Sequence, residues 1–216
     1  MDFFNFTSHS AYNFQSALDN INIEHFIDFP ISSLGILPPP PEEIMYEGAI
    51  YSTIEELPKT LKIYINDKDE SSSLYINAIT KIATRAVEIA QLQGVECFSL
   101  NLNYKSISHN FWHSDFYKDN KKNPEYFLYY LLFPLKGPGT LFCNLAPEDV
   151  ISFNLDHHAI QADLIRNKCL DNPSLTYQAP ATSGAIFNVG DNYAPIHSAP
   201  ETKDRFFLAL LLRKLR

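Results

Sequence analysis

The chain has 216 residues, and its 17 Lys and Arg against 25 Asp and Glu give a formal net charge of −8. Hydrophobic residues make up 45% and aromatic residues 13% of the chain, which is enough for a sizeable core and excludes a fully disordered protein. The longest apolar run without tyrosine, 206–212, has seven residues, far fewer than the ~20 that a membrane-spanning helix needs. The acidic balance disfavours nucleic acid as a partner.

The cysteines and the N-terminus indicate a compartment. Cys97, Cys143 and Cys169 are widely spaced and odd in number, which argues against a disulfide framework and for a reducing environment. The segment Met1–Asn5 begins with an acidic residue and is not followed by the apolar stretch of a secretory leader. We therefore expect a cytoplasmic protein.

The first 70 residues lack a sustained helical or alternating period, and their clearest feature is the run Pro38–Pro41. Proline fixes φ and lacks an N–H donor, so this run predicts a stiff, extended connector, which could also bind an aromatic-lined groove. Short helical turns are expected at 42–44 and 54–57, and a strand at 61–65. We therefore expect residues 1–70 to form an N-terminal extension that packs on, or leads into, the core.

The remaining residues, 71–216, change from a helical to a strand-like pattern. Apolar residues recur at steps of three and four over 74–93, with Ser71–Ser73 as candidate N-cap residues and Gly94 as a left-handed stop, which predicts a long helix. Gly- and Pro-rich turns then separate predicted strands at 95–104, 126–135, 140–144, 174–178, 185–189 and 205–212, with a helical insertion at 156–169. This order predicts a mostly β fold with helical support (α+β), arranged as a small sandwich or barrel.

Two distant segments contain residues that could hold a metal and an anion. His113 and Asp115 lie two residues apart, so in an extended segment their side chains point the same way. His197 lies far downstream, and Arg205 follows it at the start of the last apolar strand. Two histidines and one carboxylate form the facial triad of non-haem Fe(II) oxygenases, and a guanidinium can pair bidentately with a carboxylate. Taken singly, each feature also fits a surface turn, a loop histidine or an arginine at an exposed strand end.

Taken together, the segment 95–213 resembles the Fe(II)- and 2-oxoglutarate-dependent oxygenases of the prolyl-hydroxylase type. The resemblance rests on landmarks in a fixed order: Tyr104, His113-Ser114-Asp115, the aromatic segment 126–132, the turn and strand Gly137–Phe142, the strand Ser183–Asn188, His197 and Arg205. It implies a double-stranded β-helix core, of jelly-roll or cupin type, over 71–216, with the helix at 74–93 supporting the larger sheet.

The resemblance also implies roles for single residues. His113, Asp115 and His197 would be the metal ligands, with no catalytic side chain beyond them. Arg205 would bind the distal carboxylate of 2-oxoglutarate, helped by Tyr104 and by Tyr129 rather than its neighbour Tyr130, since only one of these two can face the site. Trp112 and Tyr117 lie next to the loop that contains His113 and Asp115 (the metal loop), and they would contact the substrate.

The implied function is an oxidoreductase that uses Fe(II), 2-oxoglutarate and O2 to hydroxylate or demethylate a protein, peptide or small-molecule substrate, with a protein side chain favoured. One departure counts against it: many relatives carry Ser or Thr two residues after the arginine, where this chain has Phe207. A tyrosine would then have to supply the missing hydroxyl. The alternative is a catalytically inactive β-helix module that binds a metal, a ligand or a protein. The cluster Asp156–His158 is a competing metal candidate, more typical of a solvated loop.

Overall fold

A computed structural model provides the structure of the chain. The residues that it describes are 8–10, 23–28, 44–49, 53–65, 70–91, 94–108, 111–116, 125–155, 160–181 and 183–215. None of the helices in these ranges combines the length and the apolar character needed to cross a membrane. The proline run Pro38–Pro41, Tyr117 and the cluster Asp156–His158 lie outside the described residues.

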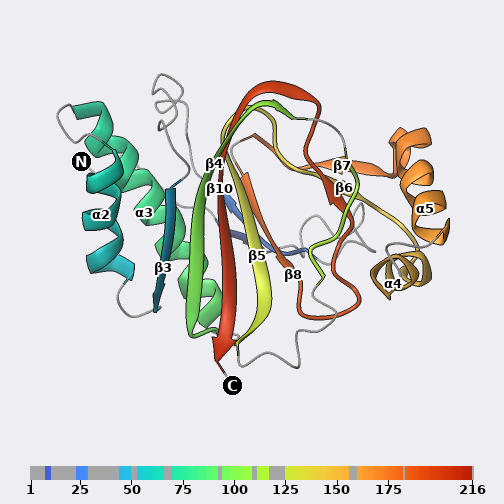
Figure 1. The fold of residues 1–216 in the computed structure, drawn as a ribbon, viewed down its shortest axis with the longest axis horizontal. Helices are drawn as coiled ribbons and strands as arrows, with labels where there is room; N and C mark the ends of the chain where they lie inside the picture. Colours follow the sequence, from blue (N-terminus) through green and yellow to red (C-terminus); the bar gives the residue numbers. More distant parts are fainter. Residues whose placement is uncertain are drawn as a thin grey trace.

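Two antiparallel sheets form the centre of the molecule (Figure 1). The larger has the strand order β1-β2-β8-β5-β10-β4-β3 and the smaller the order β7-β6-β9. The strands of the larger sheet are β1 (Ser8–Ser10), β2 (Ile23–Asp28), β8 (Ser183–Asn188), β5 (Glu125–Lys136), β10 (Thr202–Leu215), β4 (Cys97–Ser108) and β3 (Ile44–Ala49). Those of the smaller sheet are β7 (Thr176–Gln178), β6 (Leu141–Cys143) and β9 (His197–Ser198).

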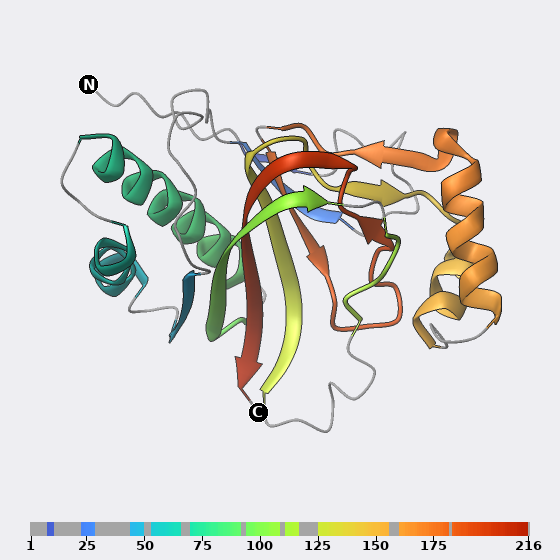
Figure 2. The same ribbon diagram turned by 45° about the horizontal axis from the view of Figure 1, so that its top comes forward.

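This is the predicted double-stranded β-helix core with helical support. Figure 2 shows β4, β5 and β10 as long, curved strands. Successive residues of a strand point to opposite faces of the sheet, so alternate residues of β10 pack in two different cores. Leu208 and Leu210 pack on the helical side of the sheet, whereas Ala209 and Leu211 pack on the side that includes Phe142 of the smaller sheet.

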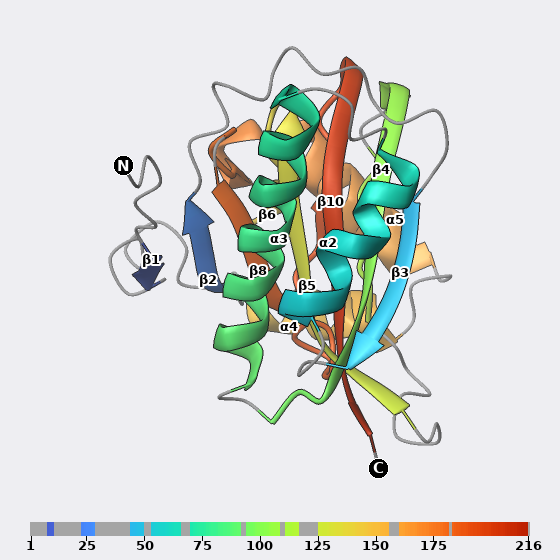
Figure 3. The ribbon, with the colours of Figure 1, turned by 90° about the vertical axis from the view of Figure 1, so that its left-hand side faces the viewer.

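Helices α2 (Thr53–Tyr64) and α3 (Glu70–Gln91) cover the outer face of the larger sheet (Figure 3). The predicted helix at 74–93 is confirmed as α3, which begins four residues earlier. Its buried residues Tyr75, Ile79, Ile82 and Ala86 repeat at three- and four-residue steps and face the sheet.

The prediction for 61–65 is wrong, because Leu61 lies inside α2 and not in a strand. Leu57 and Leu61 are one helical turn apart and both fully buried in the core shared with α3, so burial of this pair outweighs the β-propensity of Ile63 and Ile65. The helical turn at 54–57 is confirmed within α2. Where a helical turn was expected at 42–44, Ile44 instead begins β3.

Parts of the first 70 residues belong to the larger sheet. β2 pairs with β8, and β1 pairs with β2. On the other side of the sheet, β3 pairs with β4. These residues therefore extend both edges of the sheet, and a domain boundary at residue 70 stays a prediction.

Two helices lie on the other side of the molecule, away from α2 and α3 (Figure 1). α4 (Pro147–Leu155) and α5 (Ile160–Asp171) lie between β6 and β7 in the chain, and the 3-10 helix η4 (Pro173–Leu175) follows them. The predicted insertion at 156–169 corresponds to α5, whereas α4 was not predicted. Pro147 in its first turn and the acidic Glu148 and Asp149 next to it are ordinary helix-start signals.

The expectation that the cysteines are unpaired is wrong for two of the three. Cys143 on β6 and Cys169 on α5 form a disulfide. Both are buried, in a cluster that includes Val150, Phe153 and Ile165. Their sequence separation of 26 gave no hint of pairing, because the contact depends on how α5 packs on β6.

Tyr75 gives a test of the core between α3 and the sheet. It is 4% exposed, its ring stacks on Phe206 at 5.8 Å, and its hydroxyl has no hydrogen-bond partner among the described residues. Burial raises the pKa of this phenol. Tyr75→Phe removes the unsatisfied hydroxyl and keeps the stack, so we expect the free energy of unfolding in urea to rise by about 1 kcal/mol. Tyr75→Leu is the control and should lower it, whereas a destabilised Phe variant would mean that the hydroxyl has a partner.

Candidate metal and anion site

His113 and His197 are held together by the backbone. The N–H of His113 donates to the carbonyl of His197 at 2.9 Å, and the N–H of His197 donates to the carbonyl of His113 at 2.8 Å. This two-residue antiparallel bridge sets the imidazole centroids 4.4 Å apart. Asp115 follows two residues later, and the candidate ligand atoms of the three residues lie within 4.8 Å of one another. The structure therefore brings together the three residues that the sequence singled out.

Backbone carbonyls set the orientation of both imidazoles. Nδ1 of His113 lies 2.9 Å from the carbonyl oxygen of Phe111, and Nδ1 of His197 lies 3.1 Å from that of Pro195. Because a carbonyl only accepts, each Nδ1 carries the hydrogen, and the lone pair of each neutral ring is on Nε2. Such a carbonyl contact at the remote nitrogen is typical of histidines that bind metals.

The contact between His197 and Asp115 needs a positive charge. Nε2 of His197 lies 3.2 Å from Oδ2 of Asp115, and that buried oxygen has no hydrogen-bond partner among the described residues. Two acceptors at this distance repel unless a proton or a cation lies between them. The residues present therefore fit a metal ion.

The electrostatics of the cluster favour the ligand forms of its side chains. Burial and the neighbouring His197 lower the pKa of His113, so its imidazole is neutral at neutral pH. Burial alone would raise the pKa of Asp115, but the hydrogen bond with His197 and the positive charge that either histidine has when protonated outweigh it, and the pKa is lowered. Two imidazole nitrogens and one carboxylate suit a divalent metal with open positions.

Aromatic rings from both sheets surround His197, which is 2% exposed. The ring of Phe187 on β8 lies 5.0 Å and that of Phe142 on β6 lies 6.0 Å from its imidazole, and the two phenyl rings meet edge to face. His197, the distal one of the three candidate ligands, therefore lies in a dry part of the β-helix.

Arg205 is a buried cation without a buried anion. It is 3% exposed, and no carboxylate among the described side chains pairs with it. Its guanidinium donates to the carbonyl of Pro138 at 3.4 Å and lies over the ring of Phe207 at 4.6 Å. Burial lowers its pKa to about 10, so it stays charged at neutral pH. A buried, unpaired guanidinium is costly, and an anionic ligand would offset that cost.

Thr140 supplies the hydroxyl that is absent at Phe207. Its buried Oγ1 accepts a hydrogen bond from Nη2 of Arg205 at 3.2 Å. Thr140 lies two residues before Phe142, which pairs with His197 across β6 and β9, so one short segment connects the Arg205–Thr140 contact to the histidine pair. The expected replacement was a tyrosine, and the sequence signal for Thr140 was its place in the Gly137–Phe142 turn.

The register of β5 decides between the two neighbouring tyrosines. Tyr129 lies opposite Leu212 and packs with the core between the larger sheet and the helices α2 and α3 (the helix-side core). Tyr130 lies opposite Leu211 and packs with the core on the other face of the sheet, which includes Phe142. The ring of Tyr130 meets Phe187 edge to face at 5.6 Å. The structure thus favours Tyr130 over Tyr129 as the tyrosine on the side of the site.

The other predicted residues fall in three places. Trp112 is 2% exposed and packs with the cluster beneath α4 and α5, so it offers almost no surface to a substrate. Tyr104 pairs with Phe206 through its backbone, and its side chain lies outside the described part, as does Tyr117. Phe111, which the sequence also places beside His113, is 62% exposed and its ring stacks on that of His113 at 6.0 Å.

No family model matches the sequence, and no curated protein resembles it significantly. Solved structures of hydroxylases do resemble the fold. A Pseudomonas putida prolyl-4-hydroxylase matches with a TM-score of 0.39 and 15% identity, over 79% of this chain and 86% of that one. A viral collagen prolyl hydroxylase from Paramecium Bursaria Chlorella virus-1, solved with 2-oxoglutarate, gives 0.41 and 11%, over 92% and 99%. The Kdo hydroxylase KdoO with cobalt(II), a non-haem Fe(II) and α-ketoglutarate-dependent dioxygenase, gives 0.42 and 10%, over 97% and 86%.

The fold is similar to that of Fe(II)- and 2-oxoglutarate-dependent oxygenases. At these identities and scores the likeness concerns the fold alone. The chemistry of the site rests on the contacts of this chain.

Gly139 gives a test of the turn that carries Thr140. A Cβ at this position would collide with the carbonyl oxygen of Ala179. Gly139→Ala must therefore displace the turn or the neighbouring segment, and we expect the free energy of unfolding to fall by about 1–3 kcal/mol in urea denaturation. An unchanged value would show that the turn moves away from Ala179 without cost.

Proposed function

We propose that this protein is an Fe(II)- and 2-oxoglutarate-dependent dioxygenase that hydroxylates or demethylates a protein, peptide or small-molecule substrate. The observation that carries the proposal is the contact between the lone pair on Nε2 of His197 and the buried Oδ2 of Asp115 at 3.2 Å. A metal ion satisfies both atoms, and His113 adds a second imidazole nitrogen to the set.

In this proposal His113, Asp115 and His197 hold the iron through two nitrogens and one oxygen. Bound iron supplies the redox chemistry with O2 that no protein side chain offers. The carbonyls of Phe111 and Pro195 keep Nδ1 of each imidazole protonated, so that Nε2 stays directed to the metal.

Arg205 and Thr140 would bind the distal carboxylate of 2-oxoglutarate. The guanidinium supplies charge, and the hydroxyl of Thr140, which accepts from Arg205, can donate its own hydrogen to a carboxylate oxygen. Phe207 covers one face of the guanidinium. The aromatic rings of Phe142 and Phe187 would exclude water from the reacting centre.

Phe111 is the residue that we propose as the first substrate contact, in place of Trp112. Its exposed ring lies directly beside the proximal ligand His113. A net charge of −8 favours a basic substrate over a nucleic acid. The choice between a protein side chain and a small molecule stays a prediction.

The alternative function, an inactive binding module, was based on Phe207. The hydrogen bond from Arg205 to Thr140 weakens that argument, since a hydroxyl is present beside the guanidinium. A cytoplasmic location stays a prediction, and the Cys143–Cys169 disulfide is more typical of an oxidising compartment.

Metal binding is the first test of this function. We expect anaerobic titration of Fe(II) to give one site per chain. His113→Ala and Asp115→Ala should each weaken the Fe(II) affinity by at least about 100-fold, because loss of a residue that merely hydrogen-bonds to a metal ligand already weakens metal affinity by about 10–100-fold. Asp171→Asn, at the exposed end of α5, is the matched control and should bind like the wild type. Wild-type affinity in either ligand variant would refute the ligand set.

The cosubstrate site has a separate test. Arg205→Ala should raise the dissociation constant for 2-oxoglutarate by about 10–100-fold, because hydrogen bonds to charged groups contribute about 1.5–3 kcal/mol. Thr140→Val should raise it less, by about fivefold, while Thr140→Ser keeps the hydroxyl and the affinity. Iron affinity should stay unchanged in all three variants, as measured by calorimetry. If Arg205→Ala binds 2-oxoglutarate normally, the carboxylate anchor lies elsewhere.

A further inference from the structure

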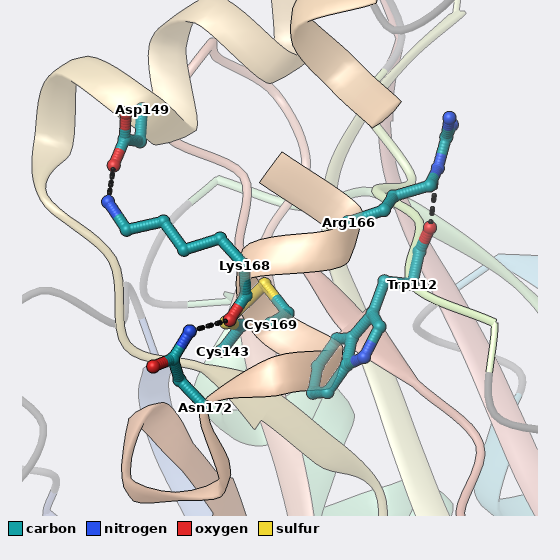
Figure 4. The surroundings of a disulfide bond; sticks show 7 residues. All are labelled: Trp112, Cys143, Asp149, Arg166, Lys168, Cys169 and Asn172. Carbon is teal, nitrogen blue, oxygen red and sulfur yellow. Dashed lines mark hydrogen bonds and ion pairs between the residues drawn. A yellow bond between two sulfur atoms is a disulfide. The ribbon is translucent and has the colours of Figure 1, made fainter. Parts of the chain in front are cut away.

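Helix α5 contacts both chain segments that carry the metal cluster. Nε of Arg166 donates to the carbonyl of Trp112, the residue before His113, at 3.1 Å (Figure 4). One turn later, Cys169 is bonded to Cys143 on β6. The N–H of Cys143 in turn donates to the carbonyl of Ile196, the residue before His197, at 2.9 Å. A single helix therefore links the residues that precede both histidines.

Arg166 is fixed from several directions. Its Nη1 lies 2.7 Å from Asp163 on the same helix. Its guanidinium lies over the ring of Phe153 at 5.1 Å and over that of Phe111 at 5.5 Å. The guanidinium thus contacts α4, α5 and the metal loop at once. A lysine, which has a single ammonium group and no planar face, cannot make the same set of contacts.

The metal loop needs such support because it has little sheet structure of its own. Within 111–116 the only strand-type pairing is the bridge of His113 to His197. The carbonyl of Phe111 orients the imidazole of His113, and Arg166 holds the next carbonyl along the chain. Because Trp112 lies between Phe111 and His113, a shift of Arg166 would move the carbonyl of Trp112 and, through the shared backbone, the imidazole of His113.

We propose that Arg166, locked in place by the Cys143–Cys169 disulfide, is a positioning residue for His113, and that the oxidation state of this disulfide sets the metal affinity of the site. The inference rests on the proposed metal site. Reduction would break the S–S bond and leave two thiols. α5 would then lose its covalent link to β6.

The reductant for the test is tris(2-carboxyethyl)phosphine. It transfers two electrons to the disulfide, water supplies the two protons and the oxygen, and the phosphine becomes its oxide. Because both sulfurs are buried, reduction follows local opening of α5. The variant Cys143→Ala with Cys169→Ala reproduces the unlinked state without a reductant.

The experiment is a Co(II) titration of the full chain, followed by calorimetry and by the visible absorption of the bound ion. We expect Arg166→Ala to weaken Co(II) by about 10–100-fold, as removal of outer partners of metal ligands does. Arg166→Lys should recover part of the affinity. The double cysteine variant and the reduced wild type should show a similar loss of Co(II) affinity. Adding Arg166→Ala to the cysteine variant should lower the Co(II) affinity little further, because both changes act through one helix.

Lys168→Ala is the matched control. Lys168 lies on the same helix but points to Asp149 on α4, at 2.6 Å, and away from Trp112 (Figure 4). An exposed ion pair contributes only about 0–1 kcal/mol, so Co(II) affinity should change by less than about fivefold. Circular dichroism and thermal unfolding of each variant separate loss of fold from loss of positioning.

The outcomes distinguish the two proposals. A wild type that binds no Co(II) contradicts the proposed function itself. If the wild type binds and Arg166→Ala matches Lys168→Ala, the positioning role is overturned while the metal site stands. If reduction leaves the affinity unchanged, the role of the disulfide is overturned.

Discussion

The two backbone hydrogen bonds between His113 and His197 are the contact on which the candidate site depends. They join a loop and a two-residue strand that lie far apart in the chain, and they set the imidazoles 4.4 Å apart. The strand of His197 is itself held by Phe142 on β6. The register of the small sheet therefore sets where the two histidines meet, and Asp115 joins them from the same loop as His113.

Two buried charges in the interior carry a desolvation cost that bound ligands would reduce. The interior contains a carboxylate, Asp115, and a guanidinium, Arg205, both largely buried. Among the described residues neither has the full ionic pairing that would offset its loss of water. The two charges are opposite in sign and come from different segments, the loop 111–116 and β10. A cation beside Asp115 and an anion beside Arg205 would each remove a desolvation cost. Under the proposed function, these two ligands would be the metal and the acidic cosubstrate.

The sequence predicted the elements whose patterns are local and missed the contacts that depend on distant packing. Helix α3 and the strands β5 and β10 have strong periodic or apolar signals, and the His113, Asp115 and His197 set has a recognisable spacing. Spacing in the sequence favours Tyr129 over Tyr130, and the pattern of β5, which is apolar on both faces, does not correct that choice. A strand buried on both sides has no polar face to reveal its phase. The hydroxyl of Thr140 and the disulfide of Cys143 were missed for a related reason, since each partner comes from another part of the chain.

The two helical layers differ in what they do for the site. α2 and α3 cover the outer face of the larger sheet, and their buried residues contact the helix-side core only. α4 and α5 pack instead on Trp112 and Ile196, the residues that precede the two histidines. We expect a change in α2 or α3 to alter stability without moving a candidate ligand. A change in α4 or α5 can alter the direction of Nε2 of the histidines while all three candidate ligands remain. Variation in α5 is therefore a way to tune the proposed metal site while its three candidate ligands stay constant.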